Sequence, residues 1–202
     1  MNSRHPKVDV YPLSNYSVEI KGAKIQRRTC DAARFTHMEY KYLKYGMKTS
    51  VEGILLVHEH KHPHVLMLKK GNAFYKLPGG KLRPGEDEIE GLKRKLSRNL
   101  AFNQPPEFQP DWQIGQEVAM WWRPNFTKHM YPYCPPHIEK PKEERKMFIV
   151  HLSNRQDFVV PGNYDLVAVP FFDLYDNPQR YGPVYSSIPL QLSRFDFKAM
   201  SL

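Results

Sequence analysis

The segment LPGGKLRPGE, residues 77–86, decides the fold together with the residues on either side of it. Before it, FYK (74–76) begins a short strand that ends at Pro78-Gly79-Gly80. After it, apolar residues recur at helical spacing from Glu86 to about Leu100, with Pro84-Gly85 just ahead of the start. The segment therefore predicts a strand, a tight glycine-rich loop and a long amphipathic helix. The apolar positions of this helix are Ile89, Leu92, Leu96 and Leu100.

Strands are predicted on both sides of this helix. Residues 51–59 and 64–70 are rich in Val, Ile and Leu and flank a polar tip at 60–63, which is typical of a β-hairpin. Further strands are predicted over 114–122, 146–152 and 164–174, and shorter helices over 31–44 and 186–197. This pattern indicates an α/β fold in which helices cover a mixed sheet.

The chain length bounds the domain organisation. A chain of 202 residues fits one domain with an extension, since domains commonly hold ~100–200 residues. Residues 1–45 are basic and show little periodicity apart from the predicted helix. We expect them to form an N-terminal extension with a short helix, and residues 46–202 to form the main domain.

Composition favours an anionic partner. The chain carries 30 Lys and Arg against 21 Asp and Glu, a net charge of +9, which favours nucleic acid over a membrane surface because no basic amphipathic helix is evident. Apolar runs are far shorter than the ~20 residues of a membrane-spanning helix, and the start has no apolar signal segment. Membrane association and secretion are therefore not expected. Cys30 and Cys134 are far apart and are expected to be free thiols.

The loop and helix resemble the Nudix box, G-x5-E-x7-R-E-U-x-E-E-x-G-U, where U is aliphatic. Gly80, Glu86, Arg94 and Leu96 match its glycine, first acid, arginine and first aliphatic position. Glycines suit a tight loop that brings phosphate close to the backbone N–H groups of a helix start. The resemblance implies a Nudix α/β/α sandwich with a mixed β-sheet, with residues 46–202 as a Nudix-like domain.

The box departs from the pattern at the positions that hold metal. Active Nudix hydrolases bind Mg²⁺ through carboxylates one, four and five residues after the arginine, where this chain has Lys95, Arg98 and Asn99. A lysine or arginine near a divalent cation costs ~4 kcal/mol per charge pair at 4 Å and moderate dielectric. Ala101 also replaces the closing glycine. We therefore expect no catalysis, no metal and no cofactor.

Three acids near the helix start keep a second hypothesis open. Glu86, Glu88 and Glu90 could support residual hydrolysis of a nucleoside polyphosphate, or they could simply complement the helix dipole. The segment 58–64 places four histidines at a spacing of two, but it lacks the HExxH pattern and lies at a predicted hairpin tip. No metal site is expected there.

A second resemblance covers nearly the whole chain. Its motifs include AARF (32–35), GMKTSVEGILLVHEHKHPHVLML (46–68), WWRPNF (121–126), YPYCPPHIEKPKE (131–143) and LYDNPQRYGPVYSSIPLQLSRFDF (174–197). The chain is similar to the small Nudix subunit of pre-mRNA cleavage factor I. This resemblance implies a nuclear homodimer that binds UGUA elements in single-stranded RNA and pairs with a larger, RRM-containing subunit. It also implies work with other polyadenylation factors in 3′-end cleavage, polyadenylation and poly(A)-site choice.

The resemblance also implies the residues of an RNA site. These are Gln26, Arg34, Glu52, Phe74, Tyr75, Leu77, Tyr131, Tyr133 and Tyr181. Aromatic rings that stack on unpaired bases, and an arginine that can bond a guanine edge in bidentate fashion, suit sequence-specific RNA recognition.

Several of these residues have another interpretation. Phe74 and Tyr75 alternate on a strand, so at least one of them belongs to the core. Tyr131 and Tyr133 could equally pack within their own loop, and Arg34 could be a solvated charge. Gln26 stands where the family has a glutamate, so a dimeric scaffold with weakened RNA specificity is a third hypothesis.

Overall fold

The computed structural model describes residues 5–22 and 31–200. In its first half the elements are β1 (Lys7–Pro12), β2 (Tyr16–Lys21), α1 (Asp31–Tyr45), β3 (Lys48–Glu59), β4 (His62–Lys70), β5 (Phe74–Lys76), β6 (Gly79–Lys81) and α2 (Glu88–Leu100). In its second half they are β7 (Gln113–Arg123), β8 (Glu143–His151), β9 (Gln156–Pro161), β10 (Asp165–Pro170), α3 (Phe171–Leu174), α4 (Pro178–Ser186), α5 (Ile188–Gln191) and β11 (Asp196–Ala199). Short 3-10 turns occupy Leu13–Asn15, Pro106–Phe108 and Leu192–Arg194.

A mixed, nine-stranded sheet organises the molecule. Strand β3 lies at its centre: it pairs antiparallel with β4 and β6 and parallel with β1 and β8. Strand β10 extends the sheet beyond β4, β7 pairs with β8, and β11 lies beside β1. Strands β2 and β9 form a separate parallel pair. The predicted α/β fold with a mixed sheet is confirmed.

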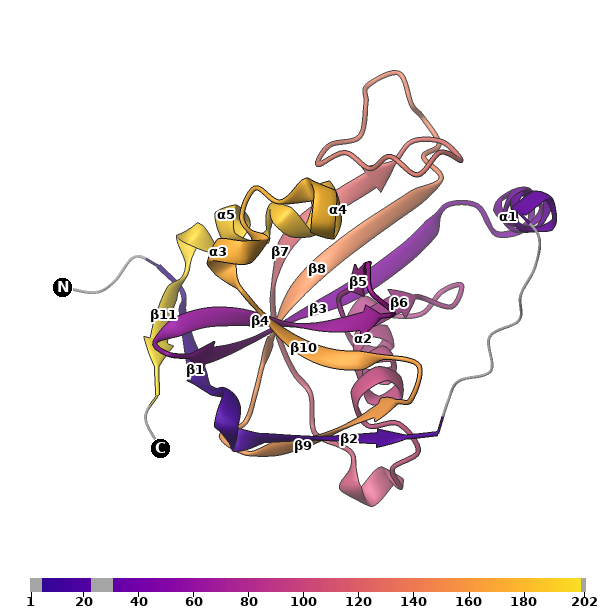
Figure 1. The fold of residues 1–202 in the computed structure, drawn as a ribbon. Coiled ribbons are helices and arrows are strands. Elements are labelled where there is room, and N and C mark those ends of the chain that lie inside the picture. The colour runs from indigo at the N-terminus through magenta and orange to yellow at the C-terminus, as the bar shows by residue number, and fades with distance from the viewer. Residues whose placement is uncertain (1–4, 23–30, 201–202) are drawn as a thin grey trace.

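Both faces of the sheet are covered. Along β3, Ile54 and Leu56 join the core shared with α3 to α5, whereas Leu55 and Val57 join the core shared with α2. Successive strand side chains point to opposite faces, so a strand covered on both sides is apolar without alternation. Figure 1 shows α2 on one side of the sheet and α3 to α5 on the other, with α1 set apart at one edge. This gives the sandwich expected of the predicted architecture.

The structure corrects several element predictions. The stretch before residue 31 contains β1 and β2, which pair with β3, β9 and β11, so those strands are part of the same sheets as the rest of the chain. The strand predicted over 164–174 ends at Pro170 and continues as α3. The helix predicted over 186–197 is only the short α5, a 3-10 turn and then β11. Strand β9 and helix α4 have no counterpart among the predicted elements.

The glycine-rich loop lies very close to β3. Gly79 has φ +151°, and a Cβ there would collide with the carbonyl oxygen of Val51. Pro78 accepts a hydrogen bond from the Gly53 N–H at 2.8 Å, and the loop residue Leu82 donates its N–H to Thr49 at 3.0 Å. Only glycine allows this approach of two backbones. The loop is therefore held against the central strand where α2 begins.

Within residues 5–22 and 31–200, no helix is both long and apolar enough to span a membrane. Cys134 is a free thiol, whereas Cys30 lies outside the described residues.

Candidate functional site

A cavity of about 590 Å³ opens beside β5, α4 and the loop that follows β7. Aromatic rings and cations line most of it. The aromatic residues are Phe74, Tyr75, Tyr131, Tyr181 and Tyr185, and the charged residues are Glu52, Lys76, Arg123, Lys128, Arg145 and Arg180. The cavity therefore combines flat apolar surfaces with positive charge.

Strand β5 presents its two aromatic rings differently. Phe74 is 54% exposed at the cavity, whereas Tyr75 is 8% exposed and belongs to the core. The prediction that at least one of them is a core residue is confirmed. The exposed Phe74 ring is free to stack on a planar ligand, while Tyr75 forms part of the rigid wall behind it.

Helix α4 supplies a second group of aromatic and cationic side chains. The rings of Tyr181 and Tyr75 meet edge to face at 4.8 Å between centroids. The Arg180 guanidinium lies 5.3 Å from the Tyr181 ring centre and 5.7 Å from that of Tyr75, and it donates to the Tyr75 hydroxyl at 3.3 Å. The Tyr181 hydroxyl donates to Asp173, and Arg180 pairs with the same carboxylate at 3.4 Å. These contacts fix one wall of the cavity.

A buried carboxylate marks the inner end of the cavity. Glu52, on β3, accepts a hydrogen bond from the Tyr185 hydroxyl at 3.2 Å and lies 3.6 Å from an Arg145 guanidinium nitrogen. Burial raises the pKa of Glu52, although Arg145 and Tyr185 oppose this shift. Its other carboxylate oxygen, Oε2, is buried and has no hydrogen-bond partner in the described part of the chain. It could receive a hydrogen bond from a ligand N–H.

The remaining predicted site residues lie around this cavity or outside the described set. Tyr131 lines it and is anchored by reciprocal backbone hydrogen bonds with Trp122, at 2.7 and 2.8 Å. Tyr133 packs against Tyr131 with 5.9 Å between ring centres but is not a lining residue. Leu77 is buried in the core directly after β5.

Two predicted residues lie where the structure gives no side-chain position. Arg34 is on α1, whose backbone is described although this side chain is not. Gln26 lies outside the described residues. The structure thus brings Glu52, Phe74, Tyr75, Tyr131 and Tyr181 to one cavity and leaves the roles of Gln26 and Arg34 as predictions.

The structure also adds residues that sequence reasoning missed. Arg180, Tyr185 and Arg145 all line the cavity and contact predicted site residues. The sequence signal for Arg180 and Tyr185 was their position on either side of Tyr181 in the resembling stretch 174–197.

The helix that would bind metal in an active Nudix hydrolase is α2, and here its residues hydrogen-bond the loop that precedes it. Glu86 precedes α2, and its carboxylate receives two 2.6 Å hydrogen bonds from Arg94 and one of 2.7 Å from the Arg83 N–H. The hydrogen bonds from Arg94 hold the pKa of Glu86 at about 2. Asp87, the residue before the helix, caps it by accepting from the N–H groups of Ile89 and Glu90.

The side chains at the expected metal-binding positions do not fit Mg²⁺. Asn99 is buried and donates to the Gly79 carbonyl at 2.9 Å. Lys95 lies against Gly80, and burial together with Arg94 and Arg98 lowers its pKa. Among residues 5–22 and 31–200, no group of three or more His, Cys, Asp or Glu side chains is placed to hold a metal ion.

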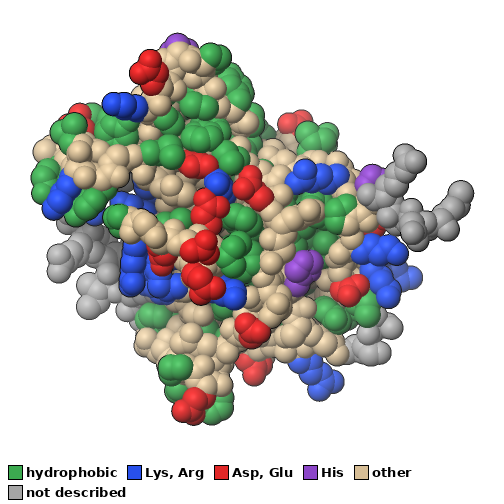
Figure 2. Space-filling model, turned by 180° about the vertical axis from the view of Figure 1, so that it is seen from behind, with side chains coloured by type: hydrophobic (Ala, Val, Ile, Leu, Met, Phe, Trp, Pro, Cys, Tyr) green, Lys and Arg blue, Asp and Glu red, His purple; other side chains and the backbone are tan. Residues whose placement is uncertain are grey.

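The outer surface around α2 carries both positive and negative side chains. Lys146 bridges Glu88 at 2.8 Å and Glu144 at 3.4 Å, and Lys93 pairs with Glu90 at 3.6 Å. Figure 2, which views the molecule from behind, shows acidic and basic side chains interspersed over the middle of that face. Two of the three acids retained near the box are thus partnered by lysines.

Comparison with known proteins identifies the family. A NUDIX_2 family model, described as nucleotide hydrolase, matches residues 6–195. A pre-mRNA cleavage factor Im 25 kDa subunit of Arabidopsis thaliana is 59% identical over 96% of each chain. The chain belongs to the cleavage factor Im 25 kDa subunit family.

Other members and neighbours agree with this assignment. The cleavage and polyadenylation specificity factor subunit 5 of Dictyostelium discoideum is 46% identical to this cleavage factor Im family member, over 91% of this chain and 90% of its own. A crystal structure from Listeria monocytogenes, described as that of a NUDIX hydrolase, shares the fold at a TM-score of 0.50, with 15% identity over 71% of this chain and 90% of that one. The Arabidopsis and Dictyostelium relatives are named as cleavage factor subunits and not as hydrolases.

Proposed function

We propose that this chain is the RNA-reading small subunit of a pre-mRNA cleavage factor, and that its cavity binds UGUA elements in single-stranded RNA. The observation that carries the proposal is the exposed Phe74 ring at the mouth of a cavity walled by Tyr75, Tyr131 and Tyr181. Proteins that read unpaired RNA stack splayed bases on such rings and bond the base edges with nearby polar groups. Glu52 lines the same cavity, and we expect its carboxylate and the backbone beside Leu77, which directly follows β5, to bond the base edges.

The proposal places the protein in the nucleus, in 3′-end cleavage, polyadenylation and poly(A)-site choice. It includes a homodimer, a larger RRM-containing subunit and other polyadenylation factors as partners. The names of its close relatives support a role in this machinery. The net charge of +9 supports an anionic partner.

RNA binding without hydrolysis is favoured over nucleotide hydrolysis. The helix after the glycine-rich loop carries Lys95, Arg98 and Asn99 where a hydrolase needs carboxylates. Glu86, the retained acid, is held in a bidentate pair with Arg94. Three N–H donors thus already engage the Glu86 carboxylate within the protein.

The deciding experiment is a titration of the full chain with a fluorescent oligonucleotide that contains UGUA, beside one of the same composition in scrambled order. We expect the UGUA sequence to bind at least tenfold more tightly, the equivalent of about 1.4 kcal/mol. Equal affinities would reject sequence-specific recognition and leave the scaffold hypothesis.

A hydrolysis assay tests the competing activity. The chain is incubated with Mg²⁺ and nucleoside polyphosphates, and released phosphate is measured. We expect no turnover above the level of buffer. Mg²⁺-dependent turnover that disappears in Glu86→Gln would establish an enzyme instead.

A further inference from the structure

A second cavity, of about 210 Å³, lies between α1, β3 and β6. Cationic side chains line most of it: Lys41 from α1, Lys48 from β3, Lys81 from β6, Arg123 from the end of β7, and Lys142 just before β8. His37, Met38 and Tyr42 complete the α1 side. We refer to this cavity as the lysine pocket.

The positive charge of the lysine pocket is only partly neutralised. Glu143 is fully buried beside it and pairs with Lys48 at 2.9 Å and with Arg123 at 3.3 Å. No carboxylate of the described residues lies within 4.0 Å of the ammonium groups of Lys41, Lys81 or Lys142. The ammonium of Lys142 instead lies over the Phe126 ring, 5.9 Å from its centre.

Burial and the neighbouring positive charges both disfavour the charged form of two of these lysines. Burial, followed by the charges of Lys41 and Lys48, lowers the pKa of Lys81. Burial also lowers the pKa of Lys142, assisted by Lys48, Arg123 and Lys81 against the opposing effect of Glu143. Like charges gathered in a concave site raise the local concentration of anions. A bound anion would relieve this repulsion.

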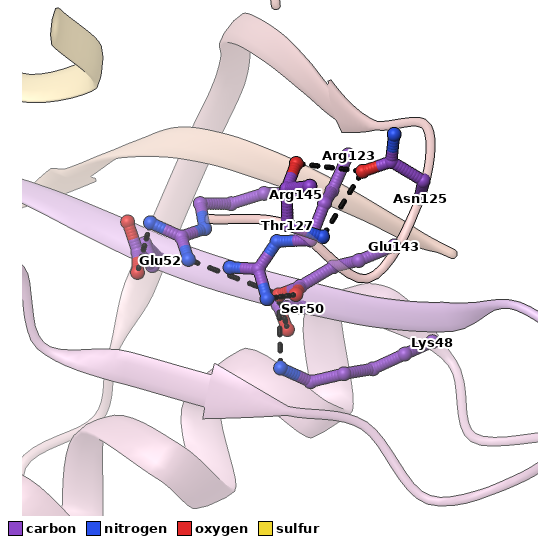
Figure 3. Close-up of polar contacts among 8 residues, drawn as sticks. All are labelled: Lys48, Ser50, Glu52, Arg123, Asn125, Thr127, Glu143 and Arg145. Carbon is purple, nitrogen blue, oxygen red and sulfur yellow. Dashed lines mark hydrogen bonds and ion pairs between the residues drawn. The ribbon is translucent and has the colours of Figure 1, made fainter. Parts of the chain in front are cut away.

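The lysine pocket adjoins the aromatic cavity. Arg123 lines both cavities, and Glu143 accepts ion pairs from Arg123 on one side and Arg145 on the other. Arg145 in turn reaches Glu52 at the inner end of the aromatic cavity. Figure 3 shows this series, with Glu143 between Lys48 and the two arginines and Glu52 beyond Arg145. A strand of nucleic acid whose bases occupy one cavity can therefore place its backbone at the other.

We infer that the lysine pocket binds a backbone phosphate of the RNA strand whose bases occupy the aromatic cavity, with Lys41 and Lys81 as its principal contacts. This inference rests on the proposed function, since it supplies the phosphate contact that accompanies base reading. Phosphate contacts position a strand and add affinity that does not depend on sequence. The pocket would thus set the path along which the RNA leaves the UGUA site.

The test uses the double variant Lys41→Gln/Lys81→Gln, which removes both charges and keeps a polar, unbranched side chain at each position. The matched control is Lys7→Gln/Lys198→Gln, because both of those lysines are exposed on β1 and β11, at the opposite edge of the molecule from α1 (Figure 1). Each protein is titrated with a UGUA oligonucleotide carrying flanking nucleotides, at several salt concentrations, and with tripolyphosphate alone.

We expect the pocket variant to bind UGUA and scrambled oligonucleotides about tenfold more weakly at ~0.1 M salt, and to reduce the steepness of log affinity against log salt by about 0.7, the value for one phosphate contact on a single strand. The control should retain most of the wild-type affinity and slope. Thermal unfolding midpoints of both variants check that they are folded.

The outcomes separate this inference from the proposed function. If the wild-type protein prefers UGUA but the pocket variant keeps wild-type affinity and slope, the lysine pocket is not an RNA contact while the function stands. If tripolyphosphate binding falls in the pocket variant and RNA binding does not, the pocket serves a free anion and the inference is wrong. If the wild-type protein does not distinguish UGUA from the scrambled sequence, the proposed function fails.

Discussion

Phe74 and Tyr75 are neighbours in sequence, but on β5 the Phe74 side chain is exposed and the Tyr75 side chain is buried. Tyr75 is buried and meets Tyr181 edge to face, so its removal would open the core. Phe74 leaves half of its surface exposed and contributes little to the core. Exposed aromatic rings on rigid strands are suited to bind flat ligands without prior rearrangement. The proposed RNA contact of Phe74 can therefore be tested separately from the contribution of Tyr75 to stability.

Phe74→Ala tests this separation. We expect RNA affinity to fall by ~1–3 kcal/mol, because one stacking surface is lost, while the melting temperature changes little. The matched control is Phe108→Ala, since Phe108 is 71% exposed on a 3-10 turn outside the cavity. Fluorescence anisotropy and thermal unfolding report the two quantities. Full affinity in Phe74→Ala would show that this ring is not a stacking surface.

A second prediction concerns the effect of Asn99 on the free energy of unfolding. Its buried amide donates to the Gly79 carbonyl, so Asn99→Asp would place a carboxylate oxygen against a carbonyl oxygen. We expect the free energy of unfolding to drop by ~1–3 kcal/mol. Asn103→Asp makes the same chemical change at an exposed position and should be nearly neutral. Urea denaturation measures both variants. An unchanged Asn99→Asp protein would mean that this hydrogen bond does not hold the loop.

At the scale of the element, α2 follows the glycine-rich loop as a Nudix helix does, but here its side chains bond the neighbouring loop. Its start is capped by Asp87, and Arg94 reaches back to the preceding loop to hold Glu86. Gly91 permits this packing, since a Cβ there would collide with the Leu82 side chain. The glycine-rich loop and the helix thus form one rigid unit, which positions β5 and β6 on either side of residues 77 and 78.

The Glu86–Arg94 pair makes stability depend on pH at the acidic end. The folded-state pKa of Glu86 is about 2, below its ordinary value of 4.5, so its contribution is present above pH 4.5 and is lost as the pH falls towards 2. Glu86→Gln should cost ~1.5–3 kcal/mol at pH 7, the range for hydrogen bonds to charged groups. The difference from wild type should shrink between pH 4.5 and 2. Denaturant titrations at several pH values measure this, and a constant difference would contradict it.

The sequence predicted those elements whose local signals are unambiguous. Helix α2 follows from Ile89, Leu92, Leu96 and Leu100, and the β3–β4 hairpin follows from two apolar runs around a polar tip. Helix α4 was missed because Gly182 and Pro183 lie inside it, and Gly182 has φ +81°, which is not helical. Tertiary packing of Tyr181, Val184 and Tyr185 on the core keeps this kinked segment in place.

In the candidate site too, features with a local signal were predicted, and features that depend on long-range contacts were not. The exposed ring of Phe74 was indicated by the family resemblance, and strand alternation predicted that one of the pair would be buried. No sequence rule predicted that Arg145 lies between Glu52 and Glu143, because the contact with Glu52 joins β8 to β3 across a long sequence separation, although Glu143 is on the same strand as Arg145. Parallel pairing of β3 with β8 brings them together.

At the scale of the whole molecule, charge and selectivity have different sources. In the proposed function, the net charge of +9 attracts any nucleic acid, whereas the aromatic cavity is the part that would contact particular bases. We therefore expect UGUA and scrambled oligonucleotides to lose affinity in parallel as salt rises, so that their ratio stays nearly constant. Titrations between ~50 and 200 mM salt measure the two slopes. A ratio that collapses with salt would place the selectivity in charge contacts instead.

Helix α1 is attached to the rest of the molecule by few contacts. Phe35 and Tyr42 pack on Phe126 with about 5.7 and 5.6 Å between ring centres, and the Tyr42 hydroxyl donates to the Lys140 carbonyl at 2.6 Å. None of the α1 side chains that the structure describes is buried. Segments with little buried apolar surface open at low free-energy cost.

Because α1 is weakly attached, the hydrogen-exchange rate of its amides should show whether a ligand fills the lysine pocket. The lysine pocket exists only while Lys41 faces Lys81 across it, so a ligand there binds the docked helix and not the detached one. By mass action, exchange of the α1 amide hydrogens with deuterium should slow by up to about tenfold when the pocket is filled, the ratio of the RNA affinities expected with and without the pocket contacts. Amides of β3 and β8, deep in the sheet, exchange only when the whole protein unfolds, so they should slow by the full factor of about 1 + [RNA]/Kd.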